Sequence, residues 1–342
     1  MRFGVIGSGS WATALAKILT DNQVHVNWWV RNEIVIRHLQ TRHHNPNYLS
    51  SVYFDSSLLS LHSRLQNIIQ ASDCLIIAVP SAYVMETFHG LEKEDLMGKK
   101  LVSAVKGIIP QGNLLLNEFL KQEFGMELDN YFTVMGPCHA EEIAAEKLSY
   151  LTFSGADETT TAEIASHFST QYLNIILNND IFGVQYAAVL KNIYALGAGM
   201  AHGLEYGDNF LSVLIANCAD EMAGFLRKVG IRHIEVGIHD AGTRKKTGNY
   251  AASVYLGDLL VTCYSPYSRN RTFGNMIGKG YSVKTAQLEL NMVAEGYNAC
   301  RCIHLINQTL QADLPIAETI YSILWENVKV GDGFKQIEEF LV

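Results

Sequence analysis

The chain has 342 residues, enough for two domains that each bury a full hydrophobic core. Its 48% hydrophobic and 18% charged residues are typical of a compact soluble protein. A net charge of −8 argues against nucleic acid or an anionic membrane surface as the main partner. An anionic small-molecule ligand would therefore need locally placed positive charges.

The opening residues show no secretion signal, because the first apolar run is short and broken by glycines. The most apolar long segment, residues 181–204, contains Gln185, Lys191, Asn192 and His202. These polar side chains favour a buried helix over a membrane span. The cysteines form no C-x-x-C pair and no zinc spacing, so we expect reduced thiols, no metal site and a cytoplasmic location. They are Cys74, Cys138, Cys218, Cys263, Cys300 and Cys302.

The first twenty residues predict a strand, a glycine turn and a helix. Residues 3–6 form a short apolar run, Gly7-Ser8-Gly9-Ser10 follows, and residues 11–19 carry a helical apolar period. Gly7 permits a tight turn, and Gly9 lets the backbone approach a pyrophosphate. Ala12 stands where a small residue allows the helix to pack on the strand. This order favours a dinucleotide site over a purely structural turn.

The residues after the second expected strand bear on the choice of cofactor. Residues 23–30 predict that strand, and Arg31 follows it directly, with Glu33 two positions further on. An acid here would hold the ribose hydroxyls of NAD, whereas an Arg would accept the 2′-phosphate of NADP. Arg31 favours acceptance of NADP, NAD remains open, and an ordinary exposed arginine at a helix start is an equally good reading.

Further strands are expected at residues 74–79, 101–105, 131–135, 148–154 and 172–177, with helices near 65–70 and 159–168. Residues 38–60 give no firm element. Strands that alternate with helices predict a parallel sheet whose ligands lie beyond the carboxyl ends of the strands, where Lys106 and Gly136 fall. From residue 180 the periodicity is mostly helical. We therefore predict an α/β Rossmann-type N-terminal domain (1–180) and a C-terminal all-α domain (181–342), with a long basic loop at 230–253.

Lys191 is the most informative single residue. It is the only Asp, Glu, Lys or Arg between Asp180 and Glu205, and its neighbours one helical turn away are alanines and a tyrosine. A buried lysine without an acid on its own helix is costly unless something else compensates, and burial lowers its pKa toward a range useful for proton transfer. A lysine whose chain merely extends to the surface is the alternative. We favour the functional interpretation.

A second group of candidates follows in the C-terminal half. Ser268 is a plausible N-cap, but Arg269 and Arg271 in the first turn of the helix would oppose its dipole unless a phosphate is bound there. Two solvated arginines are the simpler alternative. Asp258 is an acid among apolar residues, so it is either a cap or a buried partner for a cation such as Lys191.

Taken together, these stretches resemble the bacterial NAD(P)-dependent glycerol-3-phosphate dehydrogenase family over nearly the whole chain. The motifs that carry the resemblance are GSGSWATALAKIL (7–19), SAVKGI (103–108), MGPCHAEEIA (135–144), AAVLKNIYALGAGMAHGL (187–204), LGDLLVTCYSPYSRNRTFG (256–274) and VAEG (293–296). The family is similar in fold to the domains predicted above and is often dimeric. The resemblance implies reversible hydride transfer between dihydroxyacetone phosphate and sn-glycerol 3-phosphate, which supplies the backbone of glycerophospholipids.

The resemblance also implies roles for individual residues. The cofactor, NADP or NAD, would contact Gly7, Gly9, Ser10, Trp11, Arg31, Lys106, Ala140, Arg269, Val293 and Glu295. The small phosphate substrate would contact Lys106, Gly136, Cys138, Lys191, Asp258, Ser268, Arg269 and Asn270. Lys191 would act as general acid and base, with Lys106 and Asp258 as its catalytic companions.

Three stretches depart from the family's pattern. Cys138 stands where the family usually has a hydroxyl residue, the 230–253 loop is longer than usual, and Phe210-Leu211 replace a usual Thr-Lys. Two other functions remain open: a related reductase of a hydroxyacid or ketoacid, and a non-catalytic NAD(P)H-sensing protein. A carboxylate substrate would indicate the first, and cofactor binding unaffected by loss of Lys191 would indicate the second.

Overall fold

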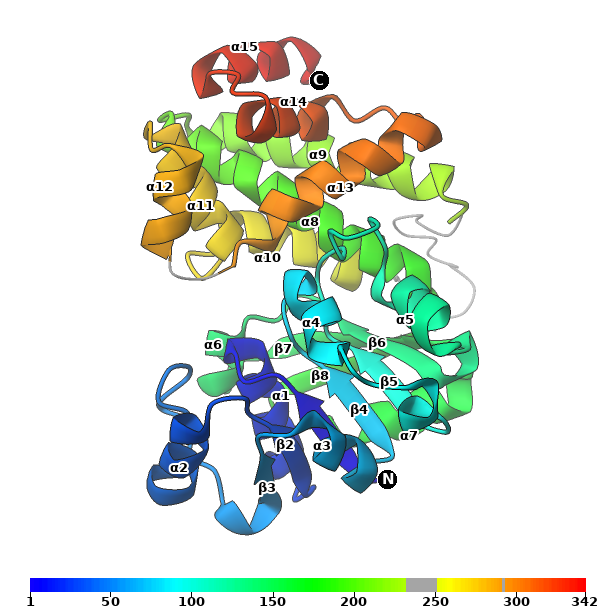
Figure 1. The fold of residues 1–342 in the computed structure, drawn as a ribbon. Helices are drawn as coiled ribbons and strands as arrows, with labels where there is room; N and C mark the ends of the chain where they lie inside the picture. Colours follow the sequence, from blue (N-terminus) through cyan, green and yellow to red (C-terminus); the bar gives the residue numbers. More distant parts are fainter. Residues whose placement is uncertain (232–250, 291–292) are drawn as a thin grey trace, which may run out of the picture. The chain divides into compact units, whose positions relative to one another are not determined.

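The structure is a computed structural model that describes residues 1–231, 251–290 and 293–342 (Figure 1). Its backbone contacts define two compact units, and the chain passes from one unit to the other more than once. The first unit contains Met1–Val105 and Leu114–Ile181, and the second contains Lys106–Asn113 and Phe182–Val342. Lys106–Asn113 therefore packs with the second unit, although it lies within the expected N-terminal domain of residues 1–180.

The first unit is built on an eight-stranded sheet in the order β3-β2-β1-β4-β5-β6-β7-β8. The strands are β1 (Phe3–Ile6), β2 (Val26–Trp29), β3 (Leu59–His62), β4 (Cys74–Ile77), β5 (Lys100–Ser103), β6 (Tyr131–Met135), β7 (Ser149–Gly155) and β8 (Leu173–Asn178). Neighbouring strands run parallel except β6 and β7, which are antiparallel. The predicted parallel sheet is therefore confirmed for every neighbouring pair of strands except this one.

A short link explains the antiparallel pair. The only helix between β6 and β7 is α6 (Ala140–Ala144), which has five residues. Such a helix rises about 7.5 Å, whereas a strand of this length spans roughly 17 Å. After α6 only four residues, 145–148, remain before β7 begins at Ser149, so the chain turns back beside β6 and the two strands run antiparallel.

Helices cover both faces of the central strands. Phe3 and Val5 belong to the same apolar cluster as Leu15 of α1 (Ser10–Asp21). Gly4 faces the opposite way, because a Cβ added there would lie 2.9 Å from Ile68 of α3 (Leu65–Ala71). Since successive residues of a strand point to opposite faces, α1 and α3 pack on opposite faces of β1. The Rossmann-type prediction for this part of the chain is confirmed.

The remaining helices of the first unit follow the strands in order. They are α2 (Glu33–Arg42), η1 (Ser56–Leu58), η2 (Ser81–Tyr83), α4 (Val84–Phe88), η3 (Lys93–Leu96), α5 (Leu116–Phe124), η4 (Leu128–Asn130) and α7 (Glu158–Ser166). Sequence analysis predicts no firm element at 38–60, yet α2 reaches Arg42 and β3 begins at Leu59. Both have weak apolar patterns, since α2 buries only Val35 and Leu39 and every residue of the edge strand β3 is half-buried.

Every named element of the second unit within its described residues is a helix, which confirms the predicted all-α fold. Its helices are α8 (Ile181–Gly203), α9 (Asp208–Lys228), the π-helical η5 (Ala251–Gly257), α10 (Asp258–Tyr264), α11 (Arg269–Gly278), α12 (Val283–Leu290), α13 (Glu295–Leu310), α14 (Pro315–Trp325) and α15 (Val330–Phe340) (Figure 1). No helix in the described ranges is long and apolar enough to span a bilayer.

Only the two ends of the predicted loop at 230–253 lie within the described residues. Residues 232–250 lie outside the described part of the chain. Ala251 already begins η5, so the loop prediction is wrong for its last three residues. The run of apolar residues in Ala251–Gly257 explains this, because Val254 and Tyr255 are buried and draw the backbone into the helical core.

Glycines bring the backbones of α8 and α11 into direct contact. A Cβ added to Gly274 would lie 2.0 Å from the carbonyl oxygen of Leu196, and one added to Gly199 would lie 2.1 Å from that of Arg271. Real Cβ atoms do not approach oxygen so closely, so any larger residue would force the helices apart. This contact fixes α11 against the helix that carries Lys191.

Candidate functional site

The glycine turn of the first unit has the geometry that a pyrophosphate needs. Gly7 has φ +122°, and a Cβ there would lie 2.6 Å from the carbonyl oxygen of Ala78, so only glycine fits. A Cβ added to Gly9, in contrast, would meet no atom within 4 Å, which leaves open space over the turn. Helix α1 begins at Ser10 with no side-chain cap and no acidic residue in its first turn. Its N-terminus therefore suits an anion, and these residues fit a dinucleotide.

Other expected cofactor residues of this unit lie at the starts of helices. Ser10 and Trp11 open α1, and the buried Ala140 opens α6. Arg31 lies just after β2 and is exposed, and its guanidinium lies 3.2 Å from the carboxylate of Glu86. Cofactor contact by each of these residues remains a prediction.

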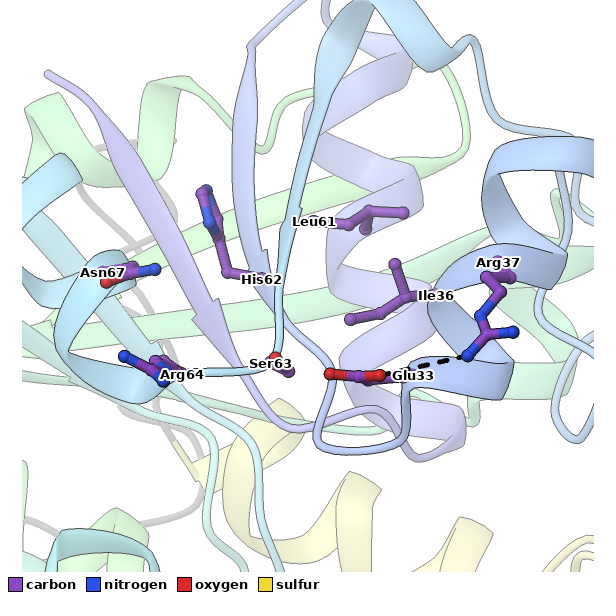
Figure 2. A pocket seen from close by; sticks show the side chains of 8 residues that line it. All are labelled: Glu33, Ile36, Arg37, Leu61, His62, Ser63, Arg64 and Asn67. Carbon is purple, nitrogen blue, oxygen red and sulfur yellow. Dashed lines mark ion pairs between the residues drawn. The ribbon is translucent and has the colours of Figure 1, made fainter.

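A hollow of about 440 Å³ lies between the start of α2 and the end of β3 (Figure 2). The residues that line it are Glu33, Ile36, Arg37, Leu61, His62, Ser63, Arg64 and Asn67. Glu33 and Arg37 form an ion pair at 4.0 Å across one helical turn of α2. The hollow thus combines two arginines and a histidine with one acid.

Gly136 and Cys138 follow β6 in the first unit. Gly136 has φ +124°, and a Cβ there would lie 2.7 Å from the carbonyl oxygen of Tyr150 on β7. Glycine is therefore required at the point where β6 meets β7. Cys138 is buried two residues later. The structure thus explains why a glycine stands at position 136. The substrate contacts expected of Gly136 and Cys138 stay predictions.

The second unit brings Lys191, Asp258 and Lys106 together. The Lys191 Nζ atom lies 2.5 Å from Asp258 Oδ1 and 3.1 Å from Thr262 Oγ1. The Lys106 Nζ atom lies 3.8 Å from Asp258 Oδ2. Lys191 is 3% exposed and Asp258 1%. Asp258 is thus the buried partner of Lys191, and Gly257 occupies the cap position of α10.

Burial controls the acidity of Lys191. The pKa of Lys191 is lowered to about 8, mainly by loss of hydration, with the carboxylate of Asp258 opposing the shift and the charge of Lys106 adding to it. The second oxygen of Asp258, Oδ2, is also buried and accepts no hydrogen bond within the described part of the chain. A buried carboxylate oxygen without a donor is costly, so this oxygen can take a hydroxyl or another donor from a ligand.

A chain of amide hydrogen bonds links four segments of the second unit. The Asn192 side chain donates to the Lys106 carbonyl oxygen at 2.7 Å, and the Asn270 side chain donates to Asn192 Oδ1 at 2.9 Å. The backbone N–H of Gly296 then donates to Asn270 Oδ1 at 2.9 Å. Both asparagines are buried. Asn270 therefore ties α11 to α8 and to the start of α13, which also places Glu295.

The start of α11 matches one expectation closely. The Ser268 hydroxyl accepts a hydrogen bond from the Arg271 backbone N–H at 3.3 Å, so Ser268 is the N-cap as predicted. Arg269 is the first residue of this helix and is exposed, and Val293 and Glu295 are half-buried. No acidic residue lies in the first turn, so the end of the helix and Arg269 both offer positive charge.

Sequence reasoning missed Thr262 and Asn192. Thr262 lies one helical turn after Asp258, and its hydroxyl also donates to the Asp258 carbonyl oxygen at 2.5 Å. Asn192 directly follows Lys191 in a segment with few polar residues, and this position is the sequence feature that could have identified it. No group of three or more His, Cys, Asp or Glu side chains in the described ranges could hold a metal ion.

Comparisons with known proteins match both halves of the chain to one family. Family models described as the N-terminus and the C-terminus of NAD-dependent glycerol-3-phosphate dehydrogenase match residues 2–161 and 180–335. A relative from Halalkalibacterium halodurans, named as an NAD(P)+ glycerol-3-phosphate dehydrogenase, is 33% identical over 95% of this chain and 90% of its own length. A relative of the same name from Macrococcus caseolyticus is 30% identical over 98% of this chain and 97% of its own.

A solved structure extends the likeness to three dimensions. The crystal structure of a glycerol-3-phosphate dehydrogenase from Coxiella burnetii superposes with a TM-score of 0.87 at 25% identity. The match covers 99% of this chain and 98% of that one. Both halves of the chain, and its fold, therefore match the same family. The chain belongs to the NAD-dependent glycerol-3-phosphate dehydrogenase family.

Proposed function

We propose that this protein interconverts dihydroxyacetone phosphate and sn-glycerol 3-phosphate with NADP or NAD as cofactor. The observation that carries the proposal is the buried cluster of Lys191, Asp258 and Lys106. Family membership and the names of the relatives support the choice of substrate. When bound, the nicotinamide cofactor supplies or accepts the hydride.

Lys191 is the proposed general acid and base. In the reductive direction its ammonium group donates a proton to the carbonyl oxygen of the substrate, which becomes the hydroxyl of the product. In the oxidative direction the neutral amine takes that proton back. A pKa of about 8 keeps both forms of Lys191 accessible near neutral pH, and Asp258 holds the amine in place at 2.5 Å.

Lys106 and Asp258 complete the proposed chemistry. Lys106, 20% exposed in its side chain, stabilises the negative charge that develops on the substrate oxygen. Asp258 Oδ2, which lacks a hydrogen-bond donor within the described ranges, is the acceptor we assign to a substrate hydroxyl. The carboxylate therefore orients both the proton donor and the substrate.

The phosphate is the proposed ligand of the start of α11. Arg269 and the backbone N–H groups of this helix offer the charge and the donors, and Ser268 caps the turn. One hydrogen of the Asn270 amide is used by Asn192, so its second hydrogen is the one we assign to the phosphate. Binding energy from this remote group then orients the reacting carbon.

NADP is the cofactor that the hollow beside α2 favours. Arg31 follows β2, and Arg37 and Arg64 line the hollow (Figure 2), so several cations are available near the place where the adenosine ribose of a Rossmann cofactor is expected. We expect Arg37→Ala and Arg64→Ala each to weaken the binding of NADPH more than the binding of NADH. Equal loss for both cofactors would contradict this assignment.

The cellular setting is proposed from the family resemblance. We propose a cytoplasmic homodimer whose product feeds glycerophospholipid synthesis. Light scattering coupled to gel filtration tests the dimer directly. A single species of about 38 kDa would rule it out, since that is the mass of one chain.

The decisive experiment is oxidation of NADPH, and separately of NADH, with dihydroxyacetone phosphate by the wild type and by Lys191→Ala. The variant should lose about 10²–10⁴-fold in rate while still binding cofactor. Turnover of a ketoacid in place of dihydroxyacetone phosphate would indicate the related reductase. Cofactor binding without any turnover, unchanged by Lys191→Ala, would indicate the sensing protein.

A further inference from the structure

Three successive carbonyl groups of the glycine turn are each held by a buried side chain. The Trp28 indole N–H donates to the Gly7 carbonyl oxygen at 2.6 Å, the Asn45 amide to that of Ser8 at 3.1 Å, and the Thr13 hydroxyl to that of Gly9 at 2.9 Å. We call Trp28, Asn45 and Thr13 the carbonyl clamp. Its members come from β2, from the segment after α2, and from α1.

The clamp is buried and internally connected. All three side chains are 0% exposed. The Asn45 amide also donates to Thr13 Oγ1 at 2.9 Å, and its oxygen accepts from the Asn47 backbone N–H at 3.0 Å. The second bond fixes which end of the amide faces the turn. A fully buried polar residue outside any helix or strand needs such partners, and here they are atoms of the turn.

The carbonyl directions determine where the turn presents its donors. In a planar peptide unit the C=O of one residue and the N–H of the next point in opposite directions. Holding the carbonyls of residues 7–9 inward therefore turns the N–H groups of Ser8, Gly9 and Ser10 away from the clamp. Within the described part of the chain these three N–H groups make no hydrogen bond to protein atoms. They are available to an anion.

We propose that Trp28, Asn45 and Thr13 are positioning residues for the cofactor pyrophosphate. By setting the peptide planes of the turn before binding, they remove an ordering cost that the cofactor would otherwise meet. This inference rests on the proposed dinucleotide-binding function. It concerns residues that touch neither substrate nor cofactor and act only through the backbone of the turn.

The sharpest variants change the donors and keep the shape. Trp28→Phe removes the indole N–H and keeps an aromatic ring. Thr13→Val removes the hydroxyl at nearly equal volume, whereas Thr13→Ser keeps it and serves as the rescue. Asn45→Ala removes the amide, and Asn45→Asp replaces the donor with an oxygen that repels the Ser8 carbonyl.

Asn27 provides a matched control in the same sheet. It is a buried asparagine on β2 whose amide donates to the carbonyl oxygens of Phe3 and Ala71 and to the Ser72 hydroxyl. None of these atoms belongs to the glycine turn. Asn27→Ala therefore deletes a comparable buried amide without touching the clamp, and it reports the effect of a general loss of stability.

The experiment is NADPH titration of the full chain followed by nicotinamide fluorescence, together with thermal unfolding and steady-state kinetics. We expect Trp28→Phe and Asn45→Ala each to raise the Kd by about 5- to 30-fold, the loss of one oriented hydrogen bond. Thr13→Val should raise the Kd less, because the Thr13 backbone N–H still donates to the Gly9 carbonyl oxygen at 2.9 Å. The KM for cofactor should rise in parallel, with kcat at saturating cofactor and the KM for dihydroxyacetone phosphate little changed. Asn45→Asp should bind more weakly than Asn45→Ala, and Thr13→Ser close to the wild type.

Two results would overturn the clamp. One is unchanged NADPH affinity in folded Thr13→Val and Trp28→Phe, and the other is an equal loss of affinity in Asn27→Ala. If Asn45→Ala does not fold, the Thr13 and Trp28 variants still decide. A folded wild type that binds neither NADPH nor NADH would instead reject the proposed function, and the clamp with it.

Discussion

At the scale of single residues, the acidity of Lys191 predicts opposite pH profiles for the two directions of the reaction. Reduction needs the ammonium form, so its kcat/KM should be level below pH 7 and fall about tenfold per pH unit above pH 8. Oxidation needs the amine, so its kcat/KM should rise up to pH 8 and then level off. Initial rates with NADPH and with NADP+ across pH 6–10 test this.

Asp258 supplies the control for that profile. Its carboxylate raises the pKa of Lys191, so Asp258→Asn should move the reductive profile to lower pH in addition to lowering the rate. A profile that stays flat between pH 7 and 9 in the wild type would show that Lys191 is not the titrating proton donor.

Glu221 of α9 gives a second prediction at this scale. Its carboxylate accepts the backbone N–H groups of Ile316 and Ala317 and the Tyr194 hydroxyl, so it caps the start of α14. Burial raises the pKa of Glu221 to about 7, whereas the unfolded chain has an ordinary carboxyl. The folded state therefore holds more protons between pH 4.5 and 7, and this group makes stability fall as pH rises through that range.

Thermal unfolding of Glu221→Gln checks this linkage. The variant cannot titrate, so its Tm should change less between pH 5 and 7.5 than that of the wild type. It should also unfold at a lower temperature, because an amide has one acceptor oxygen for the two backbone N–H groups. An identical pH dependence in both proteins would refute the assignment.

At the scale of elements, the glycine contact between α8 and α11 predicts a large cost for one methyl group. Gly274→Ala would place a Cβ 2.0 Å from the Leu196 carbonyl oxygen, so we expect a loss of about 1–3 kcal/mol in the free energy of unfolding. Asn270 would move away from Asn192, and the KM for dihydroxyacetone phosphate should rise. Denaturant unfolding and kinetics measure the two effects.

Gly224→Ala in α9 is the matched control. A Cβ there would meet no atom within 4 Å, so the change should stabilise the helix by about 0.5–1 kcal/mol. If both alanine variants are equally stable, the backbones of α8 and α11 are not held in direct contact.

The same elements show what the sequence could and could not reveal. The burial of Lys191 was predictable because its isolation among apolar residues is visible along the chain. The strand-turn-helix at the start was predictable from its periodicity. Asp258 was one of the possible partners of Lys191, but the sequence could not establish the contact, because the two residues lie 67 positions apart. The roles of Asn45 and Asn192 were not predicted, because a local sequence pattern does not show which distant carbonyl group a buried amide will bind.

At the scale of the whole molecule, thiol burial predicts resistance to oxidation. All six cysteines are free and buried. Burial raises the pKa of the thiols of Cys74, Cys218, Cys263, Cys300 and Cys302. Because the thiolate is the reactive form, dithionitrobenzoate should label the native protein slowly and titrate six thiols after denaturation. Rapid labelling of the native protein would contradict this.

The path of the chain between its two units limits how the molecule can be divided. The helical unit is assembled from Lys106–Asn113 and Phe182–Val342, and the shorter piece brings both the Lys106 ammonium group and the carbonyl that Asn192 binds. A fragment cut at residue 182 would therefore lack one cation of its own cluster. A chimera of two relatives would need to exchange both pieces together, because a single crossover near residue 180 would combine the lysine of one parent with the aspartate of the other.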